Sequence, residues 1–137
     1  MKTLRTDQKQ KGFTLLELLI AMSLLAIGLL AAASMQGTAA NANYLANRVS
    51  VANNLVQQAA EDFLSLGKTD LKLNQSTGGK VAYGTDVQVP SAGTFRTKYQ
   101  VTTNTDGKTQ IDVWVYYVSQ AGVETQAATV TTFKEVL

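Results

Sequence analysis

Residues 11–33 read KGFTLLELLIAMSLLAIGLLAAA, an apolar run that starts at Phe13 and contains one charged residue, Glu17. As a helix, the segment from Phe13 to Ala33 would rise ~30 Å, which is the thickness of the hydrocarbon core of a bilayer. The run therefore predicts a membrane-crossing helix near the N-terminus. Its carboxylate needs an explanation, because a charge inside a membrane segment is costly.

The basic residues of the chain are concentrated ahead of this run. Residues 1–12 carry four basic side chains and one acidic side chain, whereas the chain from Phe13 onward has eight basic and nine acidic residues. A basic flank favours retention of the N-terminus in the cytoplasm. The nearly neutral remainder lacks the basic patch expected of a nucleic-acid-binding protein.

The absence of cysteine and histidine from the sequence limits the chemistry. It excludes disulfides, thiolate or imidazole metal ligands, cysteine nucleophiles and a histidine base. The aspartates are scattered without the spacing of a calcium-binding loop. No set of residues resembles a catalytic site, so the sequence predicts neither an enzyme nor a cofactor.

Three interpretations fit the apolar run. In an ordinary secretory signal peptide, the chain would be cut near the small residues 31–33. In a plain signal anchor, it would stay uncut. Neither interpretation gives Glu17 a role. In the third, the chain is cut ahead of the run, so that processing removes the basic leader and keeps the apolar segment.

KGFTLLELLIAMSLLAIGLLAA resembles the N-terminus of type IV pilins and of the pseudopilins of type II secretion. The shared features are a short basic leader, Gly12 at its end, Phe13 next, and an acid at the fifth position after Gly12. The resemblance covers about the first 35 residues. It implies that prepilin peptidase cuts the Gly12–Phe13 bond of a class III leader and methylates the new N-terminal amine of Phe13.

The resemblance also implies a role for Glu17 in filament assembly. Cleavage would create an α-amine on Phe13, which can pair with Glu17 of its own chain or of a neighbour. A local alternative is a capping box, in which Thr14 and Glu17 satisfy free amides at a helix start. Gly28 is expected either to allow close helix packing or to loosen the helix in a filament.

A second helical pattern follows the apolar run. Apolar residues recur there at spacings of four and three, which predicts one stripe of an amphipathic helix. Gly67 is the expected stop, in the left-handed conformation of a helix C-cap. The stripe is expected to pack on the chain's own sheet rather than in a coiled coil, and consists of Leu45, Val49, Ala52, Val56, Ala59, Phe63 and Leu66.

The remainder has the composition of β-strands. Alternating apolar residues predict strands over residues 95–102 and 109–119, joined by an Asn104–Lys108 turn that contains Asp-Gly. A threonine-rich strand over residues 123–136 and a shorter one over residues 81–89 complete the sheet, and residues 67–80 are expected to form a loop. The sheet needs the helix to cover its apolar face.

The predicted fold class is therefore α+β and pilin-like. A long N-terminal α-helix, membrane-spanning in its first half, packs by its C-terminal half against a small antiparallel β-sheet. The expected segments are a cleaved leader (1–12), a hydrophobic transmembrane and assembly helix (13–36), its amphipathic continuation (37–66) and a C-terminal β-sheet head (67–137).

Trp114, Tyr116 and Tyr117 are expected mainly to pack within the sheet, because aromatic residues in strands usually do so. Trp114 falls on the face opposite Ile111 and Val113, so it is also a candidate for a partner contact.

Within the family, the sequence most resembles PilV-type minor pilins. Major pilins commonly have a proline near the position of Ser34 and a cysteine pair, and this chain has neither. The resemblance implies a minor subunit that primes pilus assembly with other pilins and an inner-membrane assembly platform. It would reside in the inner membrane as a single-pass protein and later at the cell surface. The alternatives are an I-type minor pseudopilin, a major pilin, and an exported adhesin or other binding module.

Overall fold

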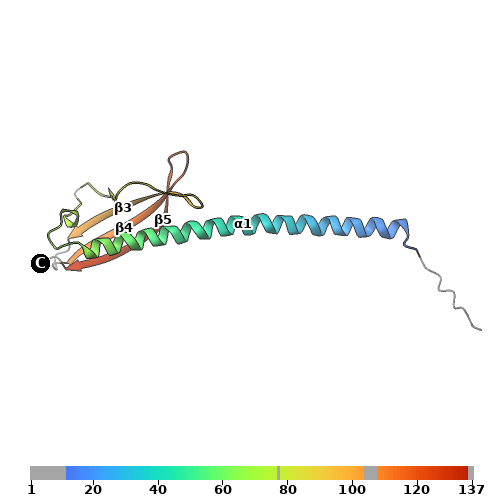
Figure 1. Ribbon diagram of the computed structural model, residues 1–137, viewed down its shortest axis with the longest axis horizontal. Helices are drawn as coiled ribbons and strands as arrows, with labels where there is room; N and C mark the ends of the chain where they lie inside the picture. Colours follow the sequence, from blue (N-terminus) through green and yellow to red (C-terminus); the bar gives the residue numbers. More distant parts are fainter. Residues whose placement is uncertain (1–11, 77, 104–107, 136–137) are drawn as a thin grey trace, which may run out of the picture. The chain divides into compact units, whose positions relative to one another are not determined.

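The computed structural model describes residues 12–76, 78–103 and 108–135. One long helix is followed by an antiparallel sheet, so the predicted α+β fold is confirmed, and the arrangement is consistent with a pilin-like fold (Figure 1). The elements are α1 (Leu15–Ser65), the 3₁₀ helix η1 (Leu71–Leu73), β1 (Val81–Ala82), β2 (Val87–Val89), β3 (Gly93–Thr103), β4 (Lys108–Val118) and β5 (Glu124–Glu135).

The described chain divides into two units, one that ends at residue 40 and one that begins at residue 41. In the first unit, every described residue from Gly12 to Ala40 is exposed. Helix α1 contains a segment that is long and apolar enough to cross a membrane, judged by length and composition. The second unit contains the rest of α1 and the whole sheet.

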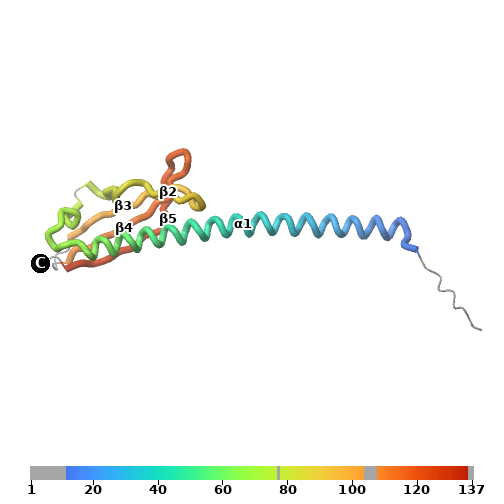
Figure 2. Tube along the Cα trace, in the orientation of Figure 1, coloured from blue at the N-terminus to red at the C-terminus, as the bar shows by residue number. Residues whose placement is uncertain are grey.

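The sheet of the second unit has the order β1-β3-β4-β5, and β2 pairs with the first residues of β3, along the same edge as β1; every pairing is antiparallel. Strands β3 and β4 pair from Thr94↔Val118 to Thr103↔Thr109. The predicted Asn104–Lys108 turn falls largely on residues outside the described ones. The C-terminal part of α1 lies along the sheet, as the trace in Figure 2 shows.

The predicted strand over residues 81–89 is wrong in detail, because it forms two short strands. The chain turns between β1 and β2, where Gly84 has a φ of +69°. A residue with a Cβ rarely adopts this conformation, so glycine permits the turn. The predicted loop over residues 67–80 likewise contains η1, where the Lys72 amide donates a hydrogen bond to the Asp70 carboxylate at 2.9 Å.

The hydrophobic core lies between α1 and the inner face of the sheet. The predicted alternation in β3 and β4 is confirmed, because Phe95, Val101, Ile111 and Val113 are buried. The helix contributes Ala52, Val56, Ala59, Ala60 and Phe63.

The prediction that the whole helical stripe is buried is wrong at its first two positions. Leu45 is 58% exposed and Val49 is 44% exposed. Both side chains line a surface hollow between α1 and the ends of β4 and β5, so the sheet does not close over them.

The end of α1 differs from the prediction for Gly67. The helix ends at Ser65, but Gly67 does not have a positive φ and therefore is not a left-handed cap. The Lys134 amine of β5 instead donates hydrogen bonds to the carbonyl oxygens of Phe63 at 3.1 Å, Leu64 at 2.7 Å and Leu66. These carbonyls have no partner within a helix, so Lys134 caps the helix from the far end of the sequence.

A tyrosine ties the loop between β1 and β2 to the last turns of α1. The Tyr83 hydroxyl donates to the Asp62 carboxylate at 2.5 Å. Burial and this bond together raise the pKa of Tyr83 to about 12. The Tyr83 ring also contacts Phe63, with centroids 5.4 Å apart.

The outer face of the sheet is polar and carries a small charge network. Arg96 pairs with Asp86 and with Glu124, each at 2.7 Å, and Lys98 pairs with Glu124 at 2.6 Å. Trp114 lies on this face as predicted, half-buried, with the Lys80 amine 4.1 Å from its ring centroid. Tyr117, further along β4, faces the helix side and contacts Phe95.

Candidate functional site at the start of the helix

The Gly12–Phe13 bond, where cleavage is expected, lies ahead of α1. Both residues are outside the helix, which begins at Leu15, and Phe13 is 81% exposed. A Cβ added to Gly12 would meet no atom of the described residues within 4 Å. Packing within this protein therefore does not explain a glycine at this position, and the bond is accessible to an external peptidase.

Thr14 caps the first turn of α1. Its hydroxyl accepts a hydrogen bond from the Glu17 amide at 3.2 Å, which is one half of the expected capping box. The reciprocal bond from the Thr14 amide to the Glu17 carboxylate is not formed in the described structure. Because the bond that is formed uses only the backbone of residue 17, it does not explain why that residue is an acid.

The Glu17 side chain makes no ion pair with any described residue. It stands in the first turn of α1, where the helix dipole favours a negative charge, typically by 0.3–1 kcal/mol. Its neighbours Leu16 and Leu18 are exposed apolar residues. A carboxylate among apolar side chains therefore remains available to a cation outside the described chain.

Further along the first unit, the hydroxyl groups find partners within the helix. Ser23 donates to the Leu19 carbonyl at 2.8 Å, and Thr38 donates to the Ser34 carbonyl at 3.2 Å. The helix is regular through Gly28, where an added Cβ would meet nothing within 4 Å. The space beside Gly28 is therefore open to another helix, and no loosening is visible there.

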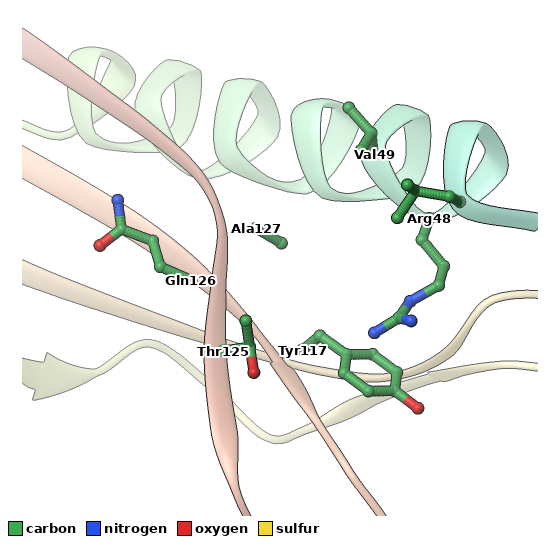
Figure 3. A pocket seen from close by; sticks show the side chains of 7 residues that line it. Arg48, Val49, Tyr117, Thr125, Gln126 and Ala127 are labelled. Atoms are coloured by element: carbon green, nitrogen blue, oxygen red, sulfur yellow. The ribbon is translucent and has the colours of Figure 1, made fainter. Parts of the chain in front are cut away.

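A second candidate site lies in the second unit and was not predicted from the sequence. It is a hollow of about 440 Å³ lined by Leu45, Arg48, Val49, Tyr117, Thr125, Gln126 and Ala127, which we call the Arg48 groove. Figure 3 shows the Arg48 side chain reaching from α1 toward the Tyr117 ring. The guanidinium carbon is 3.3 Å from the centroid of that ring. In the sequence, the only sign of this site is one arginine beside the apolar stripe. Periodicity alone assigns that arginine to the solvent-exposed face of the helix.

Residues 7–33 match a family model described as the prokaryotic N-terminal methylation motif. No curated protein and no solved structure matches the chain. The motif supports a type IV pilin-like or pseudopilin-like exported protein, and its class III leader implies processing by prepilin peptidase and assembly with other pilins. Together with the long apolar helix, it fits a membrane-anchored structural subunit.

Among the described residues, no cluster of acidic side chains has the arrangement of a metal site. The family motif and the fold suggest a structural subunit rather than an enzyme.

Proposed function

We propose that this protein is a minor type IV pilin subunit, assembled into a pilus or at its tip, where it primes filament assembly. The observation that carries the proposal is the methylation motif at residues 7–33, with an exposed Gly12–Phe13 bond ahead of the helix. Minor status is supported by Ser34 in place of the proline common in major pilins, and by the absence of cysteine. An I-type minor pseudopilin of a type II secretion system is the alternative.

The proposal assigns the start of the chain two steps. Prepilin peptidase cuts between Gly12 and Phe13, and the new amine of Phe13 is methylated. The cut removes the basic leader and keeps the apolar helix, which then holds the protein in the inner membrane with its N-terminus cytoplasmic. The helix is later available to pack against helices of other pilins.

Glu17 provides register in this assembly. No basic side chain lies between Lys11 and Arg48, so the mature apolar helix has one cation of its own, the Phe13 amine. An unperturbed α-amine has a pKa of about 7.7–8.0 and is largely protonated at neutral pH. An unpaired carboxylate in apolar surroundings is costly. The helix arrangement that pairs Glu17 with this amine is therefore favoured over arrangements that leave the carboxylate unpaired.

Intact-mass measurement of the membrane-extracted protein tests the processing. Loss of residues 1–12 and gain of one methyl group are expected. The variant Gly12→Val should stay at full length, because a branched side chain replaces the small residue before the scissile bond, while Gly28→Ala should be processed normally. A mature protein that begins at Ser34 would establish an ordinary signal peptide instead.

Recovery in sheared filaments tests the role of Glu17. Glu17→Val should be exported, cleaved and held in the membrane, but its recovery in filaments should fall by about tenfold or more, the equivalent of a lost 1.4 kcal/mol. Thr14→Ala is the matched control, since it removes the helix cap and leaves the carboxylate. Equal recovery of Glu17→Val and wild type would refute the assembly role and favour the cap.

Deletion of the gene tests minor status. Fewer filaments are expected, with the remaining ones made of another subunit. Purified filaments that consist mainly of this chain would identify a major pilin. Normal filaments combined with a defect in protein secretion would favour the pseudopilin.

A further inference from the structure

The Arg48 groove combines an apolar wall with a cation that has no acidic partner in the part of the chain that the structure describes. Arg48 forms no ion pair with any described residue, although Arg96 and Lys98 of the same unit are both paired. Leu45 and Val49 form one wall, and Ala127 contributes to the other. The first two residues of the apolar stripe, which were expected to be buried, are therefore exposed beside this cation.

The Arg48 guanidinium is held in position by aromatic rings. It stacks on Tyr117 at 3.3 Å and lies 5.4 Å from the centroid of Tyr44. A guanidinium stacked by its face keeps the N–H groups of its edge free, and these match the two oxygens of a carboxylate. The groove is therefore suited to a carboxylate that is carried on an apolar surface.

One segment of this chain has that chemistry. Among the described residues, Glu17 is the acid that stands among exposed leucines, and it has no ion-pair partner. Leu16 is 68% exposed and Leu18 is 57% exposed beside it. Other acids, such as Asp86 and Glu124, are paired on the polar outer face of the sheet.

We infer that the Arg48 groove receives the Glu17-bearing helix of a second copy of this chain. Leucines of the incoming helix cover Leu45 and Val49, and the Glu17 carboxylate accepts hydrogen bonds from the Arg48 guanidinium. A carboxylate has about four lone-pair sites, which suffice for Arg48 and for the Phe13 amine of its own chain. The inference rests on the proposed assembly into filaments, and of the two proposed places it takes the one within the pilus, where two copies are neighbours, and not a single copy at the tip.

This contact specifies a stagger between the two copies. Glu17 and Arg48 are 31 positions apart in sequence. At a helical rise of 1.5 Å per residue, parallel helices that bring the two side chains together are offset by ~46 Å. Copies anchored at the same level of a membrane lack this offset. The contact therefore forms once one copy has been raised relative to the other, as filament growth requires.

Cysteine cross-linking in filaments tests the inference, because the chain has no cysteine of its own. Two differently tagged copies are produced together, one with Leu16→Cys and the other with Leu45→Cys, and sheared filaments are oxidised. A disulfide that joins the two tags is expected. In the control pair, Leu64→Cys replaces Leu45→Cys. Leu64 is similarly exposed but lies outside the groove, so it should not link.

A second measurement tests the charge. Arg48→Gln should lower recovery in filaments by about tenfold and abolish the disulfide, whereas Arg48→Lys should keep part of both. Lys68→Gln, an exposed cation outside the groove, should match wild type. Limited proteolysis of the Arg48→Gln protein should leave the second unit as resistant as in wild type, which separates assembly from folding.

The outcomes distinguish this inference from the proposed function. If Glu17→Val is lost from filaments while Arg48→Gln is recovered at the wild-type level, the inference is overturned and the proposed function stands. Filaments that contain both cysteine variants without a mixed disulfide, or with equal linking at Leu64, also overturn it. Absence of the wild-type protein from filaments overturns both.

Discussion

In helix α1, the more apolar half is exposed, whereas the more polar half supplies the buried residues. Residues 15–40 are largely apolar, and all of them are exposed. Residues 41–65 include many polar side chains, yet they supply every buried residue of the helix, with Phe63 completely buried. Hydrophobicity therefore does not show which half of the helix the chain's own core uses. The apolar half is left for lipid or other helices, and the sheet fixes the other half.

Small residues explain how the polar half is buried. Ala52 and Ala59 are 0% and 1% exposed, and they bring the helix backbone close to the sheet. Phe63 fills the remaining space, with its ring centroid 4.7 Å from that of Tyr99. The stabilising contacts thus come from a few positions on one face, and the comparison of the two halves can be tested by changing each half separately.

Removal of the apolar half should have the largest effect. A chain of residues 41–137 retains the buried helix face and the whole sheet, so it should be soluble without detergent and show mixed helix and sheet by circular dichroism. The full chain should need a membrane or detergent, since its exposed apolar segment has no cover. A truncated chain that stays disordered until a partner is added would show that the stripe serves intermolecular packing.

Truncation of one buried side chain should come next. Phe63→Ala should lower the free energy of unfolding of the second unit by about 3–5 kcal/mol, the usual cost of removing a buried aromatic ring. Leu25→Ala, at a 63% exposed position of the apolar half, should change it by less than about 0.5 kcal/mol. Urea unfolding in detergent, followed by the fluorescence of Trp114, measures both. Similar losses would contradict the division between the halves.

Removal of the distant helix cap should have a smaller effect. Lys134→Met keeps most of the apolar stem but leaves the last carbonyls of α1 without their donor, so stability should fall by about 1–2 kcal/mol. Lys68→Met is the control, because Lys68 is exposed and the hydrogen bonds to those carbonyls come from Lys134. Equal stability of the two variants would show that water replaces the lysine without loss.

The smallest effect should come from the charge network on the outer face. Bonding to Arg96 lowers the pKa of Asp86 below 3.8, and bonding to Lys98 and Arg96 lowers the pKa of Glu124 below 4.5. A lowered pKa in the folded state gives stability that is present above the ordinary pKa and is lost as pH falls through the folded value.

Stability should therefore decrease on acidification below about pH 4.5, and Glu124→Gln should make this decrease shallower. The pairs are exposed, so the difference should be small and should shrink with added salt. Denaturant midpoints measured from pH 2 to pH 7 in low and high salt would show this. A steeper acid dependence in Glu124→Gln would contradict the assignment.

Much of the fold could be predicted from periodicity. The alternation in β3 and β4 identified the buried face, and the 3–4 spacing identified Val56, Ala59 and Phe63. Periodicity failed at Leu45 and Val49, because it describes the helix and not the extent of the sheet that covers it. It also missed the Lys134 cap, whose amine meets carbonyls 68 to 71 positions away in sequence.

The sequence by itself determined the N-terminal motif, the apolar helix and the strands, because each depends on residues close together in the chain. The position of Gly12 before Phe13, and of Glu17 within the first turn, follows from local order alone. The tertiary structure decided which helix positions are covered, how α1 is capped, and that Arg48 lies over Tyr117 without an ion-pair partner among the described residues. These features arise where strands from the end of the chain meet its helix, and side-chain contacts over such separations leave no periodic signal in the sequence.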